Sequence, residues 1–396
     1  MCSRRSTTAP APARPGATVA SVYKRVRPRD GKPDLVTWET RWRDLAGAQR
    51  KKTFTRKVDA DRYATAIEHS MLTGAYVDPK AGKVTFQEYA EQWRAGQVHR
   101  PTTQAHHETM LRRHAYPHLG HRPLADVRPS EIQAWVKRLS ESLAPTTVGV
   151  VHRIVAGIFK AAVRDRRVAT SPCEGTKLPK REPKRVEPLS TEAVAALIAT
   201  APDRYRTLLL LAAGTGMRQG EVFGLTVDRI NFLRRQVTVD RQLVLLPGRE
   251  PFLAPPKTAA SHRTIPLPQL VVDALAAHLG AFPASADGFI FTTEAGRPIR
   301  RTAFSAKVWQ PAARAAGLPP AETFHGLRHH YASLLIRHGE SVKTVQARLG
   351  HASASETLDT YSHLWPDSDD RTREAVDEAW RGAVVPPVCP QELAIQ

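Results

Sequence analysis

The chain has 396 residues, 41% of them hydrophobic and 24% charged, a size and composition typical of a folded protein of two or three domains. Its 58 lysines and arginines stand against 38 acidic residues, and the net charge of +20 predicts a polyanionic partner, most commonly nucleic acid. The longest apolar run, at 208–214, is too short to span a bilayer, and no charged-then-apolar leader opens the chain, so no membrane partner is expected.

The three cysteines, Cys2, Cys173 and Cys389, are widely separated and form no C-x-x-C pair. This spacing excludes a disulfide framework and a cysteine-based zinc site, and it suits a reducing cytoplasm. We therefore expect a cytoplasmic, DNA-associated protein without a metal or cofactor.

Residues 1–17 have the composition of a disordered basic tail, and residues 18–78 predict a small sheet with one helix. The segment 34–42 alternates apolar and polar residues and predicts a half-buried strand, with Val36, Trp38 and Trp42 on one face and Glu39 and Arg41 on the other. Partner strands are expected at 21–27 and 50–55, and a helix at 58–72. A β-ribbon fits the major groove, so this basic unit is interpreted as a DNA reader.

Residues 83–169 predict an all-helical domain. Thr85 and Glu88 form a capping box, and apolar stripes with helical spacing begin at Phe86, Ile132 and Val151. These stripes predict a core, while basic residues on the opposite faces could contact a DNA backbone. The candidate DNA-binding residues of this domain and of the sheet are Lys24, Arg25, Arg27, Arg41, Arg43, Arg112, Arg113, Lys137, Arg153 and Lys160.

Residues 170–188 are rich in proline and charge and predict a linker. Residues 189–385 predict a mostly helical α+β domain with short strands near 236–246, 251–256 and 262–267, and residues 386–396 a disordered tail. The fold class is therefore multidomain: a three-stranded sheet with a helix, an all-α domain and a mixed, mostly helical domain.

The last domain contains two motifs that are weak when taken alone. Arg218 follows a glycine-rich turn where a helix is expected to begin, and Glu221 lies one turn later, placed to orient it. Lys257 lies in a connection between strands. Each residue alone would more often be a surface or structural group.

The segments around His325 and Tyr361 give stronger signals. His325 and Arg328 are three residues apart at a helix start and are expected to project together on its exposed side, with Leu327, Leu334 and Leu335 on the buried side. Gly350 predicts a helix C-cap that leaves His351 in the following turn. Ser353 and Glu356 predict a second capping box, which begins the helix that carries Tyr361.

In type, order and spacing, the residues Arg218, Lys257, His325, Arg328, His351 and Tyr361 resemble the active-site set of the tyrosine recombinases, specifically the phage-type integrases. Residues 83–169 are similar to the core-binding domain of that family, and residues 18–78 to its arm-binding domain. The resemblance implies a site-specific integrase that cuts and rejoins DNA through a 3′-phosphotyrosine at Tyr361. It also implies double-stranded DNA with core and arm sites, a homo-tetramer on paired sites, and DNA-bending or directionality factors as partners.

Residue chemistry agrees with this resemblance. Two arginines can clamp the non-bridging oxygens of a pentavalent phosphorus, as metal ions do in other phosphoryl-transfer enzymes. His325 and His351 can hydrogen-bond the phosphate or move protons near neutral pH, nearby cations are expected to activate the Tyr361 phenol, and Lys257 can protonate the leaving 5′ oxygen. Glu221 is expected to orient Arg218.

Other classes of protein remain open at this stage. A type IB topoisomerase shares the chemistry and relaxes DNA without exchanging partners, a non-catalytic DNA-binding regulator would need no intact set, and a metal nuclease would need clusters of acidic residues. An apolar stripe of Ala375, Val376, Ala379 and Trp380 near the end of the chain fits either packing on its own domain or docking on a neighbouring protomer.

Overall fold

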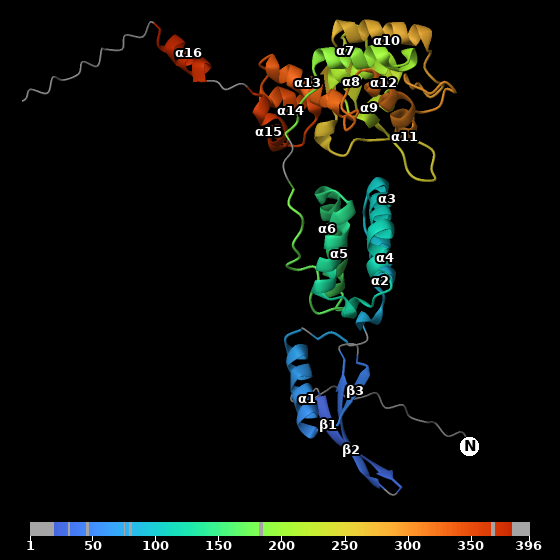
Figure 1. Ribbon diagram of the computed structural model, residues 1–396, viewed down its shortest axis with the longest axis vertical. Helices are drawn as coiled ribbons and strands as arrows, with labels where there is room; N and C mark the ends of the chain where they lie inside the picture. Colours follow the sequence, from blue (N-terminus) through green and yellow to red (C-terminus); the bar gives the residue numbers. More distant parts are fainter. Residues whose placement is uncertain are drawn as a thin grey trace, which may run out of the picture. The chain divides into compact units, whose positions relative to one another are not determined.

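The computed structural model describes residues 20–30, 32–44, 47–74, 76–78, 81–181, 185–365 and 369–381 (Figure 1). The chain divides into two compact units, residues 1–182 and residues 183–396. The tails expected at 1–17 and 386–396 lie outside the described residues.

The first unit begins with the expected sheet. Strands β1 (Ala20–Arg29), β2 (Lys32–Arg43) and β3 (Gln49–Phe54) are antiparallel in the order β1-β2-β3, and helix α1 (Lys57–Leu72) packs against them. The three strands and the helix are confirmed, with bounds that differ from the prediction by no more than two residues.

Burial in this sheet is limited to one end, at the start of β1 and the last residues of β2. Trp42 is buried and donates a hydrogen bond from Nε1 to the Tyr76 hydroxyl (2.9 Å), and the Thr40 hydroxyl donates to the carbonyl of Ala60 in α1 (3.0 Å). The cross-strand partners Val26 and Val36 are exposed. A helix of 16 residues is about 24 Å long and a strand of 12 residues is about 40 Å long, so α1 cannot cover the whole of β2.

The rest of the first unit is helical, as predicted. The capping box of Thr85 and Glu88 is confirmed at the start of the first helix. The second helix of this domain passes through a π-helical turn at Leu111–Ala115 before it continues as the third. The helices are α2 (Phe86–Ala95), α3 (Pro101–Met110), α4 (Tyr116–Leu119), α5 (Pro129–Ser142) and α6 (Pro145–Arg164).

The apolar stripes of these helices form one core. Trp135 is fully buried between α5 and its neighbours and donates from Nε1 to the carbonyl of His114 (2.8 Å). Among the described residues α6 alone is long and apolar enough to cross a membrane by length and composition. Its stripe, which includes Val151, Ile158 and Phe159, is buried in this core, so a soluble core helix explains its composition.

The beginning of the predicted linker is attached to the helical domain. Cys173 is buried in the helical core, and the side chain of Gln133 exchanges two hydrogen bonds with the backbone of Lys177 (3.0 and 2.9 Å). Residues 178–181 and 185–188 contain no helix or strand.

The second unit is mostly helical and has two small sheets, as predicted. Strands β4 (Ile230–Asn231), β5 (Gln236–Val239) and β8 (Arg263–Pro266) form one antiparallel sheet, and β6 (Gln242–Val244) and β7 (Phe252–Ala254) form a hairpin. The helices are α7 (Thr191–Thr200), α8 (Asp203–Thr215), α9 (Gln219–Phe223), α10 (Gln269–Ala281), α11 (Arg301–Phe304), α12 (Gln310–Ala315), α13 (Gly326–Arg337), α14 (Val342–Leu349), α15 (Ala354–Tyr361) and α16 (Asp369–Trp380).

Two apolar clusters hold this unit together. The larger joins α7–α10, one face of the β4-β5-β8 sheet and α12, and the smaller joins α13, α14 and α15 around Tyr331, Leu349 and Tyr361. The smaller cluster therefore fixes the end of α15 against the two helices before it. In α16 the stripe residues Val376 and Trp380 are exposed.

Candidate active site

Arg218 lies at a sharp turn between two helices. Helix α8 ends at Gly216 in the left-handed conformation (φ 63°), and a Cβ there would meet Tyr331 at 2.5 Å, so both backbone and space require glycine. Arg218 is then the N-cap residue of α9. Its backbone N–H and its Nη1 donate to the two carboxylate oxygens of Glu221 (2.8 and 3.1 Å), the contacts that an orienting role for Glu221 requires.

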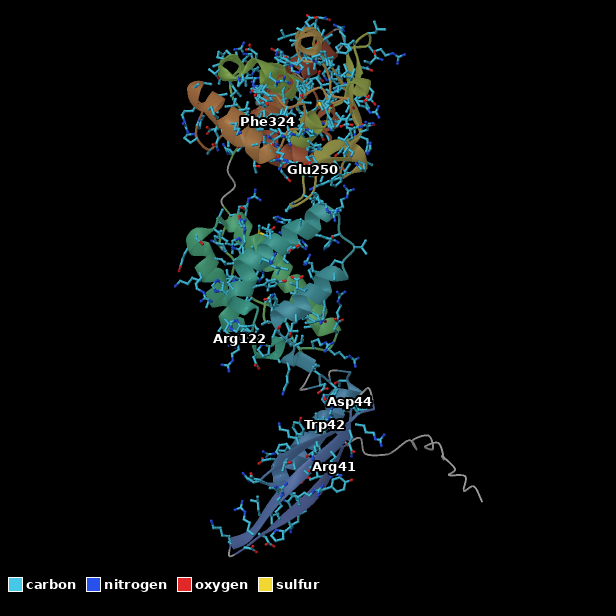
Figure 2. All side chains as sticks on the ribbon, turned by 90° about the vertical axis from the view of Figure 1, so that its right-hand side faces the viewer. Arg41, Trp42, Asp44, Arg122, Glu250 and Phe324 are labelled. Carbon is cyan, nitrogen blue, oxygen red and sulfur yellow. The ribbon has the colours of Figure 1, made fainter. Side chains whose placement is uncertain are left out.

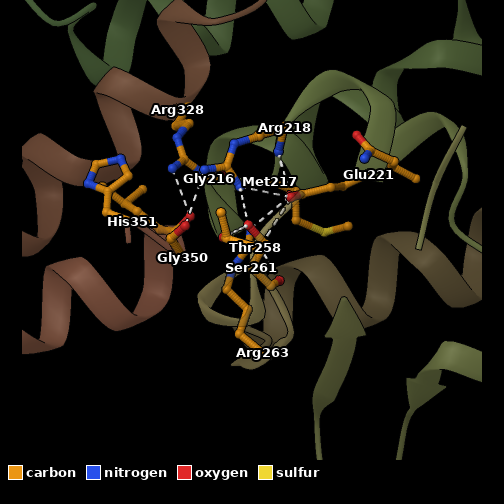
Figure 3. A network of polar contacts seen from close by, with 12 residues as sticks. Gly216, Met217, Arg218, Glu221, Thr258, Ser261, Arg263, Arg328, Gly350 and His351 are labelled. Atoms are coloured by element: carbon orange, nitrogen blue, oxygen red, sulfur yellow. Dashed lines mark hydrogen bonds and ion pairs between the residues drawn. The ribbon is translucent and has the colours of Figure 1, made fainter. Parts of the chain in front are cut away.

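Glu221 also contacts a residue that sequence reasoning missed. Arg263, the first residue of β8, is buried and donates from Nη2 and Nη1 to the Glu221 carboxylate (2.8 and 3.2 Å) and from Nε to the carbonyl of Arg348 (2.8 Å; Figure 3). Burial raises the pKa of Glu221, but the hydrogen bond and charge of Arg263 and the contacts with Arg218 outweigh it, so the pKa is lowered. Glu221 is therefore an ionised carboxylate at neutral pH.

Arg328 differs from its predicted position. It was expected on the exposed side of its helix, but it is only 3% exposed, and Leu334 and Leu335 are half-buried, while Tyr331, Ala332 and Ile336 form the buried side of α13. Its Nη1 donates to the carbonyl of Gly216 (2.8 Å) and its Nη2 to that of Leu349 (2.7 Å). The ends of two helices thus hold the guanidinium, and α13 turns it inward to reach them.

The three arginines share one carboxylate. Arg218 and Arg263 both pair with Glu221, and Arg328 has no ion pair within the described ranges. Carbonyl oxygens at helix C-termini carry partial negative charge, which favours a cation there. Burial, and then the charges of Arg218 and Arg263, lower the pKa of Arg328 to about 9, so Arg328 remains charged at neutral pH. The cluster carries an excess of positive charge at the place where an anion would bind.

His351 follows the α14 C-cap as predicted. Gly350 has φ 66°, and its carbonyl accepts a hydrogen bond from Arg218 Nη2 (3.2 Å). His351 is buried, and its Nδ1 lies 2.8 Å from the hydroxyl of Thr357 in α15. The second capping box is half correct, because the Ser353 hydroxyl accepts from the N–H of Glu356, whereas the Glu356 carboxylate accepts from the N–H of Ala352.

The expectation that His325 and His351 titrate near neutral pH is wrong. Part of His325 reaches solvent, yet burial of its ring and then the charges of Arg328 and Arg218 lower its pKa to about 4. Burial and the Arg328 charge likewise lower the pKa of His351 to about 4. Both imidazoles are therefore neutral at pH 7, because burial and then the neighbouring arginine charges disfavour the protonated ring.

Tyr361 is 1% exposed, at the end of α15. Its ring lies nearly parallel to that of His351, with centroids 6.4 Å apart, and its hydroxyl lies 2.8 Å from Nδ1 of His329. Nearby cations were expected to activate Tyr361 by lowering its pKa. Burial instead raises the pKa of Tyr361 to about 12, and the opposing charge of Arg328 does not compensate. Tyr361 is a neutral phenol in this state.

Lys257 lies where its motif predicted, in the exposed loop that joins β7 to β8. Two successive hydrogen bonds connect this loop to the arginines. The hydroxyls of Thr258 and Ser261 are 2.9 Å apart, and Arg218 Nη1 donates to the Ser261 hydroxyl (3.5 Å). The part of the loop that follows Lys257 therefore ends beside the arginine cluster.

The candidate DNA-binding residues are on the surface of the first unit. All are exposed except Arg41, which is half-buried. Arg41, labelled in Figure 2, donates a hydrogen bond to Glu39, and its guanidinium lies over the ring of Tyr23, 5.2 Å from the ring centroid. Arg25 lies 3.8 Å from the same carboxylate. Glu39 thus holds two of the basic side chains on one face of the sheet.

No group of three or more histidine, cysteine, aspartate or glutamate side chains that could hold a metal ion occurs in the described part of the chain.

Replacement of Glu221 by Gln should strongly destabilise the second unit. The change leaves buried Arg263 without a charged partner, and loss of one member of a buried pair costs about 3–5 kcal/mol of unfolding free energy. The Glu221 pKa is lowered by folding, so its contribution is present above the ordinary carboxylate pKa and disappears as the pH falls through the lowered value. Denaturant unfolding should therefore show a large difference from the parent protein at pH 7 and a smaller one in acid.

A matched control is Glu250→Gln, which removes a carboxylate from the exposed pair with Arg300 (3.2 Å). Little change is expected, because exposed ion pairs contribute little. If the two variants unfolded alike, Glu221 would not be the centre of the cluster.

Two family models match most of the chain, the phage integrase family over residues 187–367 and the phage integrase central domain over residues 86–177. The chain belongs to the phage integrase family of tyrosine recombinases. It is accordingly a site-specific tyrosine recombinase of the kind that mobile elements encode.

Individual relatives agree with this assignment. The chain is 28% identical to a tyrosine recombinase XerC-like protein of Caldanaerobacter subterraneus, over 64% of this chain and 71% of that protein. It is 27% identical to a putative prophage phiRv2 integrase of Mycobacterium tuberculosis, over 79% and 84% of the two chains. The fold resembles that of the Tn1549 transposon integrase in complex with a circular intermediate DNA (TM-score 0.65, 21% identity, 74% of this chain and 99% of that chain). It also resembles a lambda integrase dimer bound to a core site (TM-score 0.57, 18% identity, 83% and 94%).

Proposed function

We propose that this integrase cuts and rejoins DNA through a 3′-phosphotyrosine at Tyr361, and so integrates or excises a mobile element. The observation that supports the proposal best is the set of contacts that links the predicted residues. Arg218 and Arg328 bond to the backbone just before His351, and the ring of His351 lies beside that of Tyr361. Residues separated by more than a hundred positions thus surround one small volume.

The arginines would bind the scissile phosphate. A phosphodiester under attack gains negative charge on its non-bridging oxygens, and preorganised cations lower the energy of that state. Arg218 and Arg328 are already held by Glu221 and by backbone carbonyls, so they need little reorganisation when the charge develops. The excess positive charge of the cluster supports this role.

The remaining residues would move protons. In the proposed reaction the Tyr361 oxygen bonds to phosphorus, the bond to the 5′ oxygen breaks, and Lys257 gives that oxygen a proton. Neutral His325 and His351 would donate hydrogen bonds to the phosphate oxygens. The phosphotyrosine retains the energy of the broken bond, so a second strand can displace the tyrosine without ATP.

The proposal is tested by trapping and mapping the covalent complex. A nicked suicide substrate that carries a candidate core site loses the fragment needed for religation, so the adduct should accumulate. Peptide mapping should find DNA on Tyr361, and labelling of either end should show the 3′ phosphate on the protein. Mapping to another residue would contradict the proposed nucleophile.

For its partners, we propose core-site and arm-site DNA, a homo-tetramer on paired sites, and DNA-bending or directionality factors. Solved relatives support the core-site DNA and the tetramer, since lambda integrase has been seen as a dimer on a core site and as a tetramer on a Holliday junction. The sheet of β1–β3, with its exposed Lys24, Arg25 and Arg27, would read the arm sites.

Deletion of residues 1–80 should separate arm binding from cleavage. The segment contains 17 basic and 8 acidic residues, a net charge of +9. Because DNA binding by cations releases counterions, loss of these charges should weaken the salt dependence of binding to arm-site DNA. Cleavage of core-site DNA should persist, and recombination of substrates with flanking arm sites should fall.

DNA that lacks arm sites provides the control, on which the full-length and shortened proteins should cleave at similar rates. Undiminished recombination of arm-containing substrates by the shortened protein would mean that the sheet has another role.

A further inference from the structure

The hydroxyl of Tyr361 contacts a histidine outside the predicted set. His329 follows Arg328 in α13, and its Nδ1 lies 2.8 Å from the Tyr361 oxygen, with the two ring centroids 5.6 Å apart. On its other side the ring of His329 meets that of His325 edge-on, with centroids 4.7 Å apart. His329 therefore lies between Tyr361 and His325.

The direction of this hydrogen bond follows from the surroundings. Burial, and then the charges of His325 and Arg328, lower the pKa of His329 to about 4, so its ring is neutral and has one nitrogen that accepts. Tyr361 is 1% exposed, and the described residues offer its hydroxyl no other hydrogen-bond partner. If Nδ1 donated, the phenol proton would be buried without an acceptor, which is unfavourable. Tyr361 therefore donates and His329 Nδ1 accepts.

We propose that His329 is a further catalytic residue, which orients the Tyr361 oxygen and accepts its proton as the bond to phosphorus forms. This inference rests on the proposed role of Tyr361 as nucleophile. The proton passes from the Tyr361 oxygen to His329 Nδ1 while that oxygen gives an electron pair to phosphorus, and the bond to the 5′ oxygen breaks. In the religation step the imidazolium returns the proton to the departing phenolate. The bound phosphate supplies a negative charge that favours the imidazolium.

The geometry separates this role from those of the other histidines. His351 Nδ1 is 2.8 Å from the Thr357 hydroxyl, and His330 Nδ1 is 2.8 Å from the carbonyl of Leu189. Neither contact involves the Tyr361 oxygen. His329 is the histidine whose nitrogen is placed, before any DNA binds, at the atom that must lose a proton.

The test combines two substitutions with a change in the acidity of the nucleophile. In His329→Asn the amide oxygen lies near the position of Nδ1, so a hydrogen-bond acceptor remains but a base does not. In His329→Gln the amide oxygen lies further along the side chain, so the acceptor is also lost from the position of Nδ1. Both should slow adduct formation on the suicide substrate by about 10²–10⁴, the usual effect of losing a general base. Substrate binding, followed by gel shift, should be unchanged. His330→Asn, on the same helix with its bond to a backbone carbonyl, should react at the parent rate.

Incorporation of 3,5-difluorotyrosine at position 361 provides the decisive measurement, because its more acidic phenol depends less on a general base. The ratio of the parent rate to the His329→Asn rate should therefore shrink by at least tenfold with this residue, and it should not shrink with a 5′-bridging sulfur in the DNA. An unchanged ratio with difluorotyrosine would overturn the proposal. Faster adduct formation by either His329 variant would also overturn it, since His329 would then restrain Tyr361.

Failure of the inference differs from failure of the proposed function. If the parent protein formed no adduct, or formed one that survived Tyr361→Phe, the nucleophile itself would be wrong. If the parent adduct mapped to Tyr361 and the His329 variants reacted normally, only the role of His329 would fall.

Discussion

Tyr361→Phe should abolish the covalent protein–DNA adduct while DNA binding and folding persist. The substitution removes one oxygen from a ring that is 1% exposed, and the ring itself continues to fill the cluster of α13, α14 and α15. Without that oxygen no bond to phosphorus can form, so cleavage should fall below detection and not merely slow. Denaturing gels would measure the adduct, gel shift the binding, and thermal unfolding the fold.

Tyr331→Phe is the matched control. Tyr331 is buried in the same cluster at 7% exposure, and removal of its hydroxyl should leave adduct formation intact. An adduct that persisted in Tyr361→Phe would place the nucleophile elsewhere, and loss of the adduct in both variants would point to damage to the cluster.

Lys257→Ala should cleave ordinary DNA about 10²–10⁴ more slowly, the usual effect of removing a general acid. A 5′-bridging sulfur leaves as a thiolate with a pKa near that of a cysteine, about 8.5, and hardly needs a proton. The variant should therefore recover most of its rate on the phosphorothiolate. Single-turnover cleavage of both substrates measures the effect.

Arg218→Ala separates leaving-group protonation from phosphate binding. Its guanidinium is held by Glu221 at the cluster and would act on the non-bridging oxygens, so sulfur at the bridging position should rescue it much less. Equal rescue of both variants, or rescue of neither, would remove Lys257 from the role of acid.

The sequence predicted those features that local patterns control. Helix starts at Thr85 and Arg218 follow from capping residues three positions apart, and the helix C-cap at Gly350 follows from a glycine after a helical segment. The same applies to the core of the helical domain, because one side of each helix must face its neighbours. These interactions span one or two helical turns, so a short window of residues contains them.

The features that sequence missed depend on contacts between distant residues. Arg263 reaches Glu221 across 42 positions and the carbonyl of Arg348 across 85 positions. His329 reaches Tyr361 across 32 positions, and Arg328 reaches Gly216 across 112. Arg328 was assigned to the exposed side of α13 because charge usually faces water, whereas two helix ends compensate its burial here.

The arginine cluster has a consequence for the stability of the free protein. Arg218, Arg263 and Arg328 have one carboxylate among them, and their mutual repulsion, added to burial, lowers the pKa of Arg328. A ligand that binds only the folded state stabilises it in proportion to the logarithm of its concentration over its dissociation constant. If the scissile phosphate binds at this cluster as proposed, it would relieve the repulsion, and folding and DNA binding would be thermodynamically linked. The second unit would then be least stable without DNA, and its substrate would complete its charge balance.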